Sequence, residues 1–135
     1  MKQCVVYYES WVKDDGYPPF SVGDTIHWVL TEIYELNDPV SLGKIDYLFY
    51  FDYVKYQTYV IEGKISKIQI LYHRYIKNTD TGYHIPVDGI LVDTEHVKGF
   101  EKNINDMRVD AYIVTITDYT LRDGLKEEYN GVSSN

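Results

Sequence analysis

The residues with the clearest chemical potential lie in the segment 64–77, KISKIQILYHRYIK, which carries four Lys and Arg residues and no acidic one. Aromatic side chains beside Lys and Arg on a strand are how open β-barrels hold single-stranded nucleic acid. Each base stacked on such a ring contributes about 1–3 kcal/mol to binding. The candidate binding surface consists of Lys64, Lys67, Tyr72, His73, Arg74 and Tyr75.

Two features weigh against nucleic acid as the partner of this surface. Successive side chains of a strand point to opposite faces, so Tyr72 and Arg74 would lie on one face and His73 and Tyr75 on the other. The net charge of the chain is −8, whereas phosphate binding needs Lys and Arg to replace counterions. The basic segment would then guide an acidic partner or, as is more common, pair with acids of the same chain.

The histidines and the single cysteine offer little for a metal. One cysteine excludes a Cys-x-x-Cys zinc pattern and any internal disulfide. A site made of His73, His84 and Asp88 across a hairpin is conceivable, but histidines on strand surfaces are the simpler interpretation. Cys4 lies in the apolar run CVVYY and is interpreted as a small buried side chain rather than a nucleophile. The four histidines are His27, His73, His84 and His96. We expect no cofactor and no metal.

The sequence contains no catalytic signature. The G-x-S-x-G, G-x-G-x-x-G and phosphate-loop patterns are absent. The 21 acidic residues could include a glycosidase-type carboxylate pair, but nothing in the sequence distinguishes two of them. Ser10 beside Trp11 is better explained as a hydroxyl at a strand end. An enzyme with an unrecognised carboxylate or histidine site is kept as an alternative hypothesis.

The leading hypothesis is a non-enzymatic binding module for a protein or a small ligand. The chain has 15 tyrosines, and tyrosine is enriched at interfaces because it offers a large contact area at low entropic cost. Pairing through an exposed edge strand would make the protein a homo-oligomer. The alternative binding function is an OB-like single-stranded nucleic-acid binder that uses the basic strand 64–77.

Five tyrosines follow one another in steps of three within DYLFYFDYVKYQTYV, residues 46–60. Neither a helix nor a strand places all five on one surface, because a three-residue step drifts around a helix and alternates faces in a strand. We expect a strand or mixed element that contributes to the core with tyrosine hydroxyls at its rim. A short helix over residues 45–55 stays open.

Strands must position these residues. One strand is predicted at QCVVYYESW (3–11), which is rich in β-branched and aromatic residues. A second is predicted at TIHWVL (25–30), where apolar and polar residues alternate, and the last clear strand is VDAYIVTITDY (109–119). YHIPVDGILV (83–92) contains Pro86, which suggests an edge strand. Loops are expected at KDDGYPP, NDPVSLGK and KNTDTG, and the segment 93–107 is expected to be irregular, with room for one helical turn.

The longest strand signal is residues 58–76, and its alternation changes phase. Ile61, Gly63 and Ile65 are odd-numbered, whereas the later apolar residues 68, 70 and 72 are even-numbered. One face can carry both sets only if an extra residue is inserted, so we predict a bulge at Ser66-Lys67. A strand that bends in this way is how small barrels turn corners.

The expected fold class is therefore all-β, mainly antiparallel: a small closed or partly open β-barrel of five to six strands with at most one or two short helices. Residues 1–123 would form one domain and residues 124–135 a polar tail that frays. The apolar stretch near the N-terminus is too short for a signal peptide, and no run reaches a membrane span, so we expect a cytoplasmic protein.

The motifs ESW, PPFSVGDTIHW, GKISKIQILYHRY, HIPVDG and DAYIVTITD together resemble a family of small bacterial domains of unknown function, found mostly in actinobacteria and related Gram-positives. The resemblance covers roughly residues 4–118. It implies a bacterial protein and no assigned activity. Relatives often carry a cysteine pair where this chain has Asp14-Asp15, and this departure removes any metal or redox role there.

Overall fold

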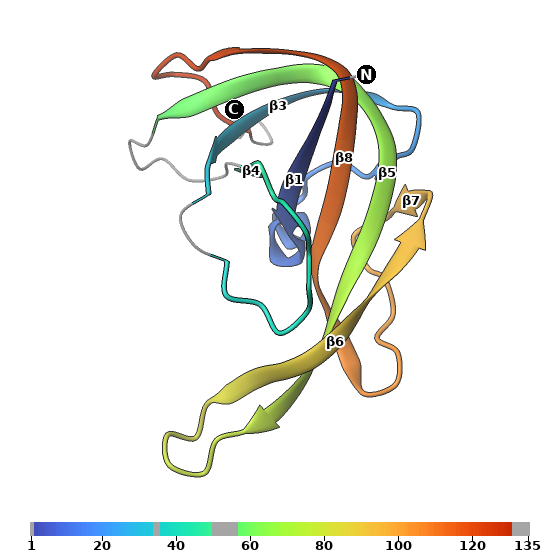
Figure 1. The fold of residues 1–135 in the computed structure, drawn as a ribbon, viewed down its shortest axis with the longest axis vertical. Helices are drawn as coiled ribbons and strands as arrows, with labels where there is room; N and C mark the ends of the chain where they lie inside the picture. Colours follow the sequence, from blue (N-terminus) through green and yellow to red (C-terminus); the bar gives the residue numbers. More distant parts are fainter. Residues whose placement is uncertain (1, 34–35, 50–56, 131–135) are drawn as a thin grey trace.

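The computed structural model describes residues 2–33, 36–49 and 57–130 (Figure 1). Nearly all its regular structure is β, with one short 3-10 helix in the described part of the chain. The elements in chain order are β1 (Gln3–Glu9), η1 (Ser10–Asp15), β2 (Phe20–Ser21), β3 (Thr25–Glu32), β4 (Tyr47–Phe49), β5 (Thr58–Lys77), β6 (His84–Thr94), β7 (His96–Val97) and β8 (Met107–Asp123).

Six of the strands form one sheet in the order β3-β4-β1-β8-β5-β6, and β3 also pairs with β5. Five of them therefore pair in a ring, and β6 continues outward from β5 as an edge strand. Figure 1 shows β5 and β8 curving side by side through the length of the molecule. The sheet is mainly antiparallel, as expected, but β1 and β4 run parallel, so it is mixed.

The predicted bulge in the long strand is confirmed. β5 is continuous, and its register against β8 shifts between Ile65 and Lys67, which leaves Ser66 as the extra residue. Ile61 and Ile65 are buried before the shift, and Ile68 is buried after it. The bulge thus lets one strand keep its apolar side chains on the inner face while it bends.

The core is largely aromatic, because several strands of the ring turn their aromatic residues inward. Tyr8 is 2% exposed, and its ring centroid lies 4.1 Å from that of Phe49 and 5.2 Å from that of Phe20. Trp28 packs edge-on against Phe20 at 5.3 Å. Aromatic pairs in such geometries contribute roughly 0.5–1.5 kcal/mol each beyond the area they bury.

The tyrosine run is described only at its two ends. Tyr47 lies in β4 and Tyr59 in β5, and their ring centroids are 5.4 Å apart. Both are half-buried, as expected for tyrosines at the rim of a core. Of the helix left open over residues 45–55, the described residues 45–49 contain strand β4 and no helix, and residues 50–55 lie outside the described residues.

The predicted loops and the edge strand are present, with two corrections. Residues 78–83 join β5 to β6, and Pro86 lies on β6, the last strand of the order. KDDGYPP overlaps η1, which ends at Gly16 with a left-handed φ of 87°. Residues 98–106 contain no helical turn; Ile104 and Met107 pair instead as an isolated bridge.

The described part of the C-terminal tail contacts the ring. The Asn130 side chain accepts a hydrogen bond from the Val29 backbone N–H at 3.0 Å and donates one to the Val29 carbonyl. Arg122 and Glu128 form a bidentate ion pair with both N–O distances at 2.7 Å. Within the described residues, no helix has the length and apolar character needed to cross a bilayer.

Candidate ligand-binding cleft

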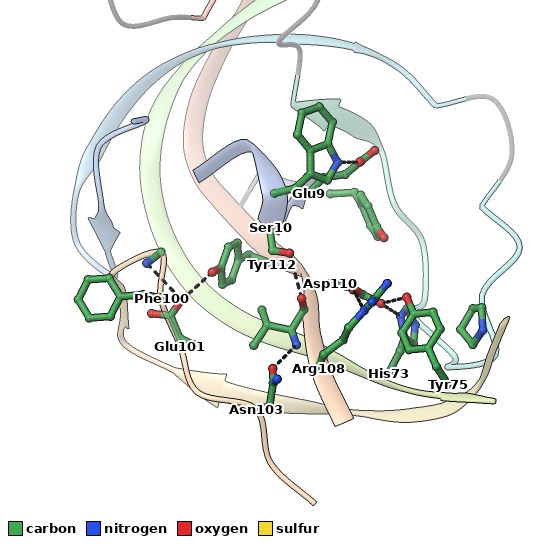
Figure 2. Close-up of a pocket in the computed structure, with 15 residues that line it drawn as sticks. Glu9, Ser10, His73, Tyr75, Phe100, Glu101, Asn103, Arg108, Asp110 and Tyr112 are labelled. Atoms are coloured by element: carbon green, nitrogen blue, oxygen red, sulfur yellow. Dashed lines mark hydrogen bonds and ion pairs between the residues drawn. The ribbon is translucent and has the colours of Figure 1, made fainter. Parts of the chain in front are cut away.

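An open cleft of about 530 Å³ lies where β1 passes into η1, beside the first residues of β8 and the loop 99–103 (Figure 2). Clefts of this size are typical of sites for small molecules. Fifteen residues line it: Tyr7, Glu9, Ser10, Trp11, His73, Tyr75, Pro86, Gly99, Phe100, Glu101, Asn103, Arg108, Val109, Asp110 and Tyr112.

A second bulge places an acidic side chain at this cleft. Leu71 pairs with Ala111 and Tyr72 pairs with Val109, so Asp110 is an extra residue of β8 at this point. Bulges of this kind re-aim a side chain and are common next to functional sites. The Ser10 hydroxyl donates to the Val109 carbonyl at 3.0 Å and so fixes the start of η1 against the same part of β8.

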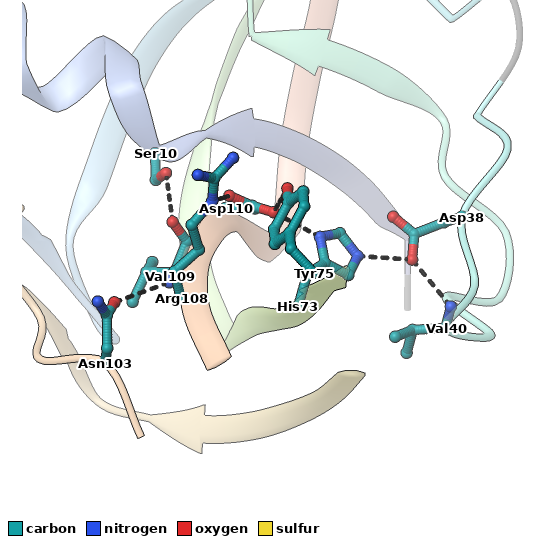
Figure 3. A network of polar contacts seen from close by, with 9 residues as sticks. All are labelled: Ser10, Asp38, Val40, His73, Tyr75, Asn103, Arg108, Val109 and Asp110. Carbon is teal, nitrogen blue, oxygen red and sulfur yellow. Dashed lines mark hydrogen bonds and ion pairs between the residues drawn. The ribbon is translucent and has the colours of Figure 1, made fainter. Parts of the chain in front are cut away.

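Asp110 belongs to a buried network centred on His73 (Figure 3). The Nδ1 atom of His73 lies 2.6 Å from Asp110 Oδ2, and its Nε2 atom lies 2.9 Å from Asp38 Oδ1. The His73 side chain is 5% exposed and that of Asp38 is 10% exposed. Asp38 also accepts a hydrogen bond from the Val40 backbone N–H at 2.9 Å. His73 therefore ties the loop 37–44 to β5 and β8.

The two carboxylates determine the charge of His73. An ionised carboxylate only accepts hydrogen bonds, so both ring nitrogens must donate, as they do in the imidazolium. Burial lowers the pKa of His73, but the hydrogen bonds that it donates to Asp38 and Asp110 raise it more, and the net pKa lies above its ordinary value. With both carboxylates ionised, the two bonds form together only in the imidazolium, which has no lone pair to accept a proton.

Arg108 is the cation that faces the cleft. Its Nε atom lies 3.2 Å from Asp110 Oδ1, and its guanidinium carbon lies 3.9 Å from the centroid of the Tyr75 ring. The Tyr75 hydroxyl donates to the other oxygen of Asp110. The Arg108 side chain is 58% exposed, so it is fixed by two neighbours and still accessible to a ligand.

The opposite wall is built around Glu101. Its carboxylate accepts hydrogen bonds from the Tyr112 hydroxyl at 2.6 Å and from the backbone N–H groups of Lys98 and Gly99 at 2.7 and 3.2 Å. Burial, and then the bond to Glu101, raise the pKa of Tyr112. Asn103 Oδ1 accepts from the Val109 backbone N–H at 3.4 Å. These contacts hold a carboxylate in a fixed position at the edge of the cleft.

The third wall is the end of β1. The Trp11 indole N–H donates to the Glu9 carboxylate, and Trp11 remains 45% exposed. Figure 2 shows Glu9 on the side of the cleft opposite Asn103. An accessible indole beside a carboxylate offers both an apolar face and a hydrogen-bond acceptor.

The six residues expected to form a binding surface do not lie together. Tyr72 is 5% exposed in the core, and its hydroxyl lies 3.4 Å from the Lys102 carbonyl. Arg74 does not line the cleft, and its Nε atom lies 3.5 Å from Asp88 Oδ1. The cleft includes only His73 and Tyr75 of the six. The remaining two, Lys64 and Lys67, are exposed on the middle of β5.

The conceivable histidine site does not assemble. His73 is paired with Gly89, whereas His84 is paired with Lys77, four residues further along β5. Across such a ribbon this separation is roughly 13 Å. Among the described residues, no group of three or more His, Cys, Asp or Glu side chains is arranged to hold a metal ion.

Sequence reasoning missed most of the cleft, including Arg108 and Asp110. A signal was present in MRVDA, where two charged residues share one face at the start of a strongly apolar strand. Asp38 gave no such signal, because it lies in a loop 35 residues before His73. The motif ESW was a second sequence signal for the cleft, because all three of its residues line it.

The fold and the site define a mostly-β protein with a ring of paired strands and an open polar cleft at the strand ends. The chain belongs to the family of unknown function DUF6578, whose model matches residues 2–118. The matched range contains every residue that lines the cleft. No curated protein and no solved structure matches the chain.

Proposed function

We propose that this protein is a non-enzymatic binding domain for a small ligand, with the cleft around Arg108 as its site. The observation that supports this most is that Asp110 and the Tyr75 ring fix the Arg108 guanidinium while its side chain stays 58% exposed in a cleft. Fixing a long arginine side chain costs conformational entropy, and an arginine with no ligand to bind would avoid this cost by staying mobile. Holding it in place lowers the cost of binding a ligand.

Binding is favoured over catalysis because the histidine that lines the cleft is engaged on both nitrogens and the single cysteine is buried. His73 donates from both nitrogens and cannot act as a general base in that state. Cys4 is 1% exposed, and burial, with a further contribution from Asp46, raises the pKa of its thiol to about 12. The prediction that Cys4 is a small buried side chain is confirmed.

An enzyme is the second candidate, because Asp110, Glu101 and Tyr75 converge on one cleft. In that case the carboxylates would do the acid–base chemistry and His73 would position Asp110. A ligand that binds at the cleft and is recovered chemically unchanged after long incubation supports the binding function; turnover of the ligand would favour the enzyme.

Binding of a protein partner or of a second copy is supported by the β5–β6 ribbon, which projects from the rest of the molecule in Figure 1. Its exposed apolar residues include Ile76 at 54% and Tyr83 at 73%. Single-stranded nucleic acid is less well supported, because Tyr72 is buried and cannot stack on a base.

We further propose that the ring of strands is a small closed barrel whose interior is filled by the aromatic core. The ligand would then bind outside the barrel, at the ends of its strands. Bacterial origin and a cytoplasmic location, expected from the sequence, stay predictions.

A screen of small polar compounds that monitors tryptophan fluorescence tests the binding function. The chain has two tryptophans: Trp11 lines the cleft, and Trp28 packs against the core. A cleft ligand should change the emission of the wild type and of Trp28→Phe, but not that of Trp11→Phe. If no compound changes the emission of Trp11, the proposed function is wrong.

A further inference from the structure

We infer that the ligand is a small hydroxylated carboxylic acid of the sugar-acid class, and that its carboxylate binds the guanidinium of Arg108. This inference rests on the proposed function and names the chemistry of its ligand.

The Arg108 wall is suited to one carboxylate. A guanidinium is a planar fork that binds carboxylates through two parallel N–H donors. Asp110 takes up the Nε edge of Arg108, and Tyr75 stacks on one of its faces. Figure 3 shows the two terminal nitrogens of Arg108 turned away from the Asp110–His73–Asp38 chain. A ligand carboxylate can therefore approach this second edge.

The network behind Arg108 does not repel an anion. Asp38 and Asp110 carry two negative charges, which are balanced by the imidazolium of His73 and by Arg108 itself. Asp110 already accepts from His73, from Tyr75 and from Arg108, so its own lone pairs are largely used. The ligand carboxylate thus meets a wall that is neutral as a whole and has its exposed donors on Arg108.

The other walls are suited to hydroxyl groups rather than to a second acid. Glu9 and Glu101 lie away from Arg108 on the rim and place two carboxylates there. Carboxylates accept strong hydrogen bonds from hydroxyl groups, whereas they repel a second negative charge. Phosphates and dicarboxylates would therefore bind less well than a monocarboxylate with several hydroxyls.

Trp11 gives the cleft one apolar face. It is 45% exposed, and its N–H is directed to Glu9, so the ring is held in position. A sugar ring carries its C–H groups on one face and its hydroxyls around the edge. Such a ring would pack its C–H face on the indole while its edge hydroxyls reach the carboxylates of the rim.

The test compares three probes of similar size by isothermal titration calorimetry. D-Glucuronate has the carboxylate and the hydroxyls, D-glucose lacks the carboxylate, and cyclohexanecarboxylate lacks the hydroxyls. We expect D-glucuronate to bind at least about tenfold more tightly than either of the others, because each lacks one set of charge-assisted hydrogen bonds. Equal affinity of all three probes, or no binding of D-glucuronate at millimolar concentration, would overturn the inference.

Arginine variants test the contact itself. Arg108→Gln should weaken D-glucuronate binding about tenfold or more, and Arg108→Lys should weaken it nearly as much because lysine lacks the planar fork. Arg74→Gln is the matched control, since Arg74 is similarly exposed on β5 but pairs with Asp88 outside the cleft. Each variant is first shown to melt within a few degrees of the wild type. Unchanged binding by folded Arg108→Gln contradicts the assignment.

The outcome also separates this inference from the proposed function. A compound without a carboxylate that changes Trp11 fluorescence, and whose affinity is unaffected by Arg108→Gln, would leave the small-ligand function standing and remove the sugar-acid assignment. A complete absence of small-molecule binding at Trp11 would remove both.

Discussion

His73 connects three segments that are distant in the chain. Its two nitrogens contact Asp38, 35 residues before it, and Asp110, 37 residues after it. Because each contact joins a charged donor to a charged acceptor in a buried place, the three residues stabilise one another only as a complete set. The network orders Asp110, and Asp110 in turn orders Arg108.

Substitution of His73 should therefore be costly. His73→Leu leaves two carboxylates without their shared donor, and breaking a buried charged set of this kind costs about 3–5 kcal/mol. Urea denaturation should show a lower free energy of unfolding by roughly that amount. His84→Leu, an exposed histidine on β6, is the control and should change stability by less than about 0.5 kcal/mol. Equal effects of the two substitutions would show that the network carries no stability.

The same network predicts how stability depends on pH. The pKa of His73 is raised above 6.5 in the folded protein, because the hydrogen bonds that it donates to the two aspartates outweigh the effect of burial. A raised pKa stabilises the fold fully below the unfolded value and less as pH rises through the folded value. The stability that the wild type has over His73→Gln should therefore shrink as pH rises from near-neutral to alkaline. A wild-type profile that rises over this range and is unchanged by the substitution would contradict this assignment.

At the scale of elements, the bulges decide which side chains meet. The register of β5 against β8 shifts at three places, and the shift at Leu71–Tyr72 is the one that directs Asp110 into the network. Another shift spans Gly63, where an added Cβ would lie 2.7 Å from both Ile116 Cγ2 and Tyr119 Cβ. Gly63 thus permits a close approach of the two longest strands.

Gly63→Ala should destabilise the ring. The new methyl group overlaps two side chains of β8, and overpacking of this kind costs typically about 1–3 kcal/mol. The comparison is Lys64→Ala, the exposed neighbour on the same strand, which should stay within about 0.5 kcal/mol of the wild type. Thermal unfolding of both variants measures the difference. A Gly63→Ala protein as stable as Lys64→Ala would mean that the strands can separate without cost.

The strands were predictable where the signal is local. The alternation in 25–30 and the change of phase near Ser66 depend only on neighbouring residues, and both were found as β3 and as the bulge in β5. The parallel pairing of β1 with β4 was not predictable, because it joins Val6 to Tyr47 without any mark in either segment. The cleft was missed for the same reason: Glu9, His73 and Arg108 meet only once the ring has formed.

At the scale of the whole molecule, pairing of β3 with β5 completes the ring, and the tail contacts β3. Asn130 satisfies both backbone groups of Val29, and the Tyr17 hydroxyl donates to the Asn130 carbonyl at 3.0 Å. The outer side of β3 is thereby connected to a residue near the C-terminus.

Removal of the Asn130 side-chain amide should lower the stability of the whole ring of strands. Asn130→Ala loses two hydrogen bonds to Val29, each worth about 0.5–1.5 kcal/mol, so unfolding should become easier by about 1–3 kcal/mol. Glu127→Ala, at an exposed position of the same tail, should leave stability unchanged. Hydrogen exchange at the Val29 amide offers an independent readout, and exchange unaffected by Asn130→Ala would contradict the contact.

The central claim is that the cleft bounded by Trp11, Glu101 and Arg108 binds a small ligand, and backbone NMR of the intact chain tests it most directly. Addition of a compound found by the fluorescence screen should shift the amide signals of Ser10, Trp11 and residues 101–110, with little change at the tip of the β5–β6 ribbon, residues 78–83, which does not line the cleft. Shifts confined to the ribbon, or spread evenly over the molecule, would contradict the claim.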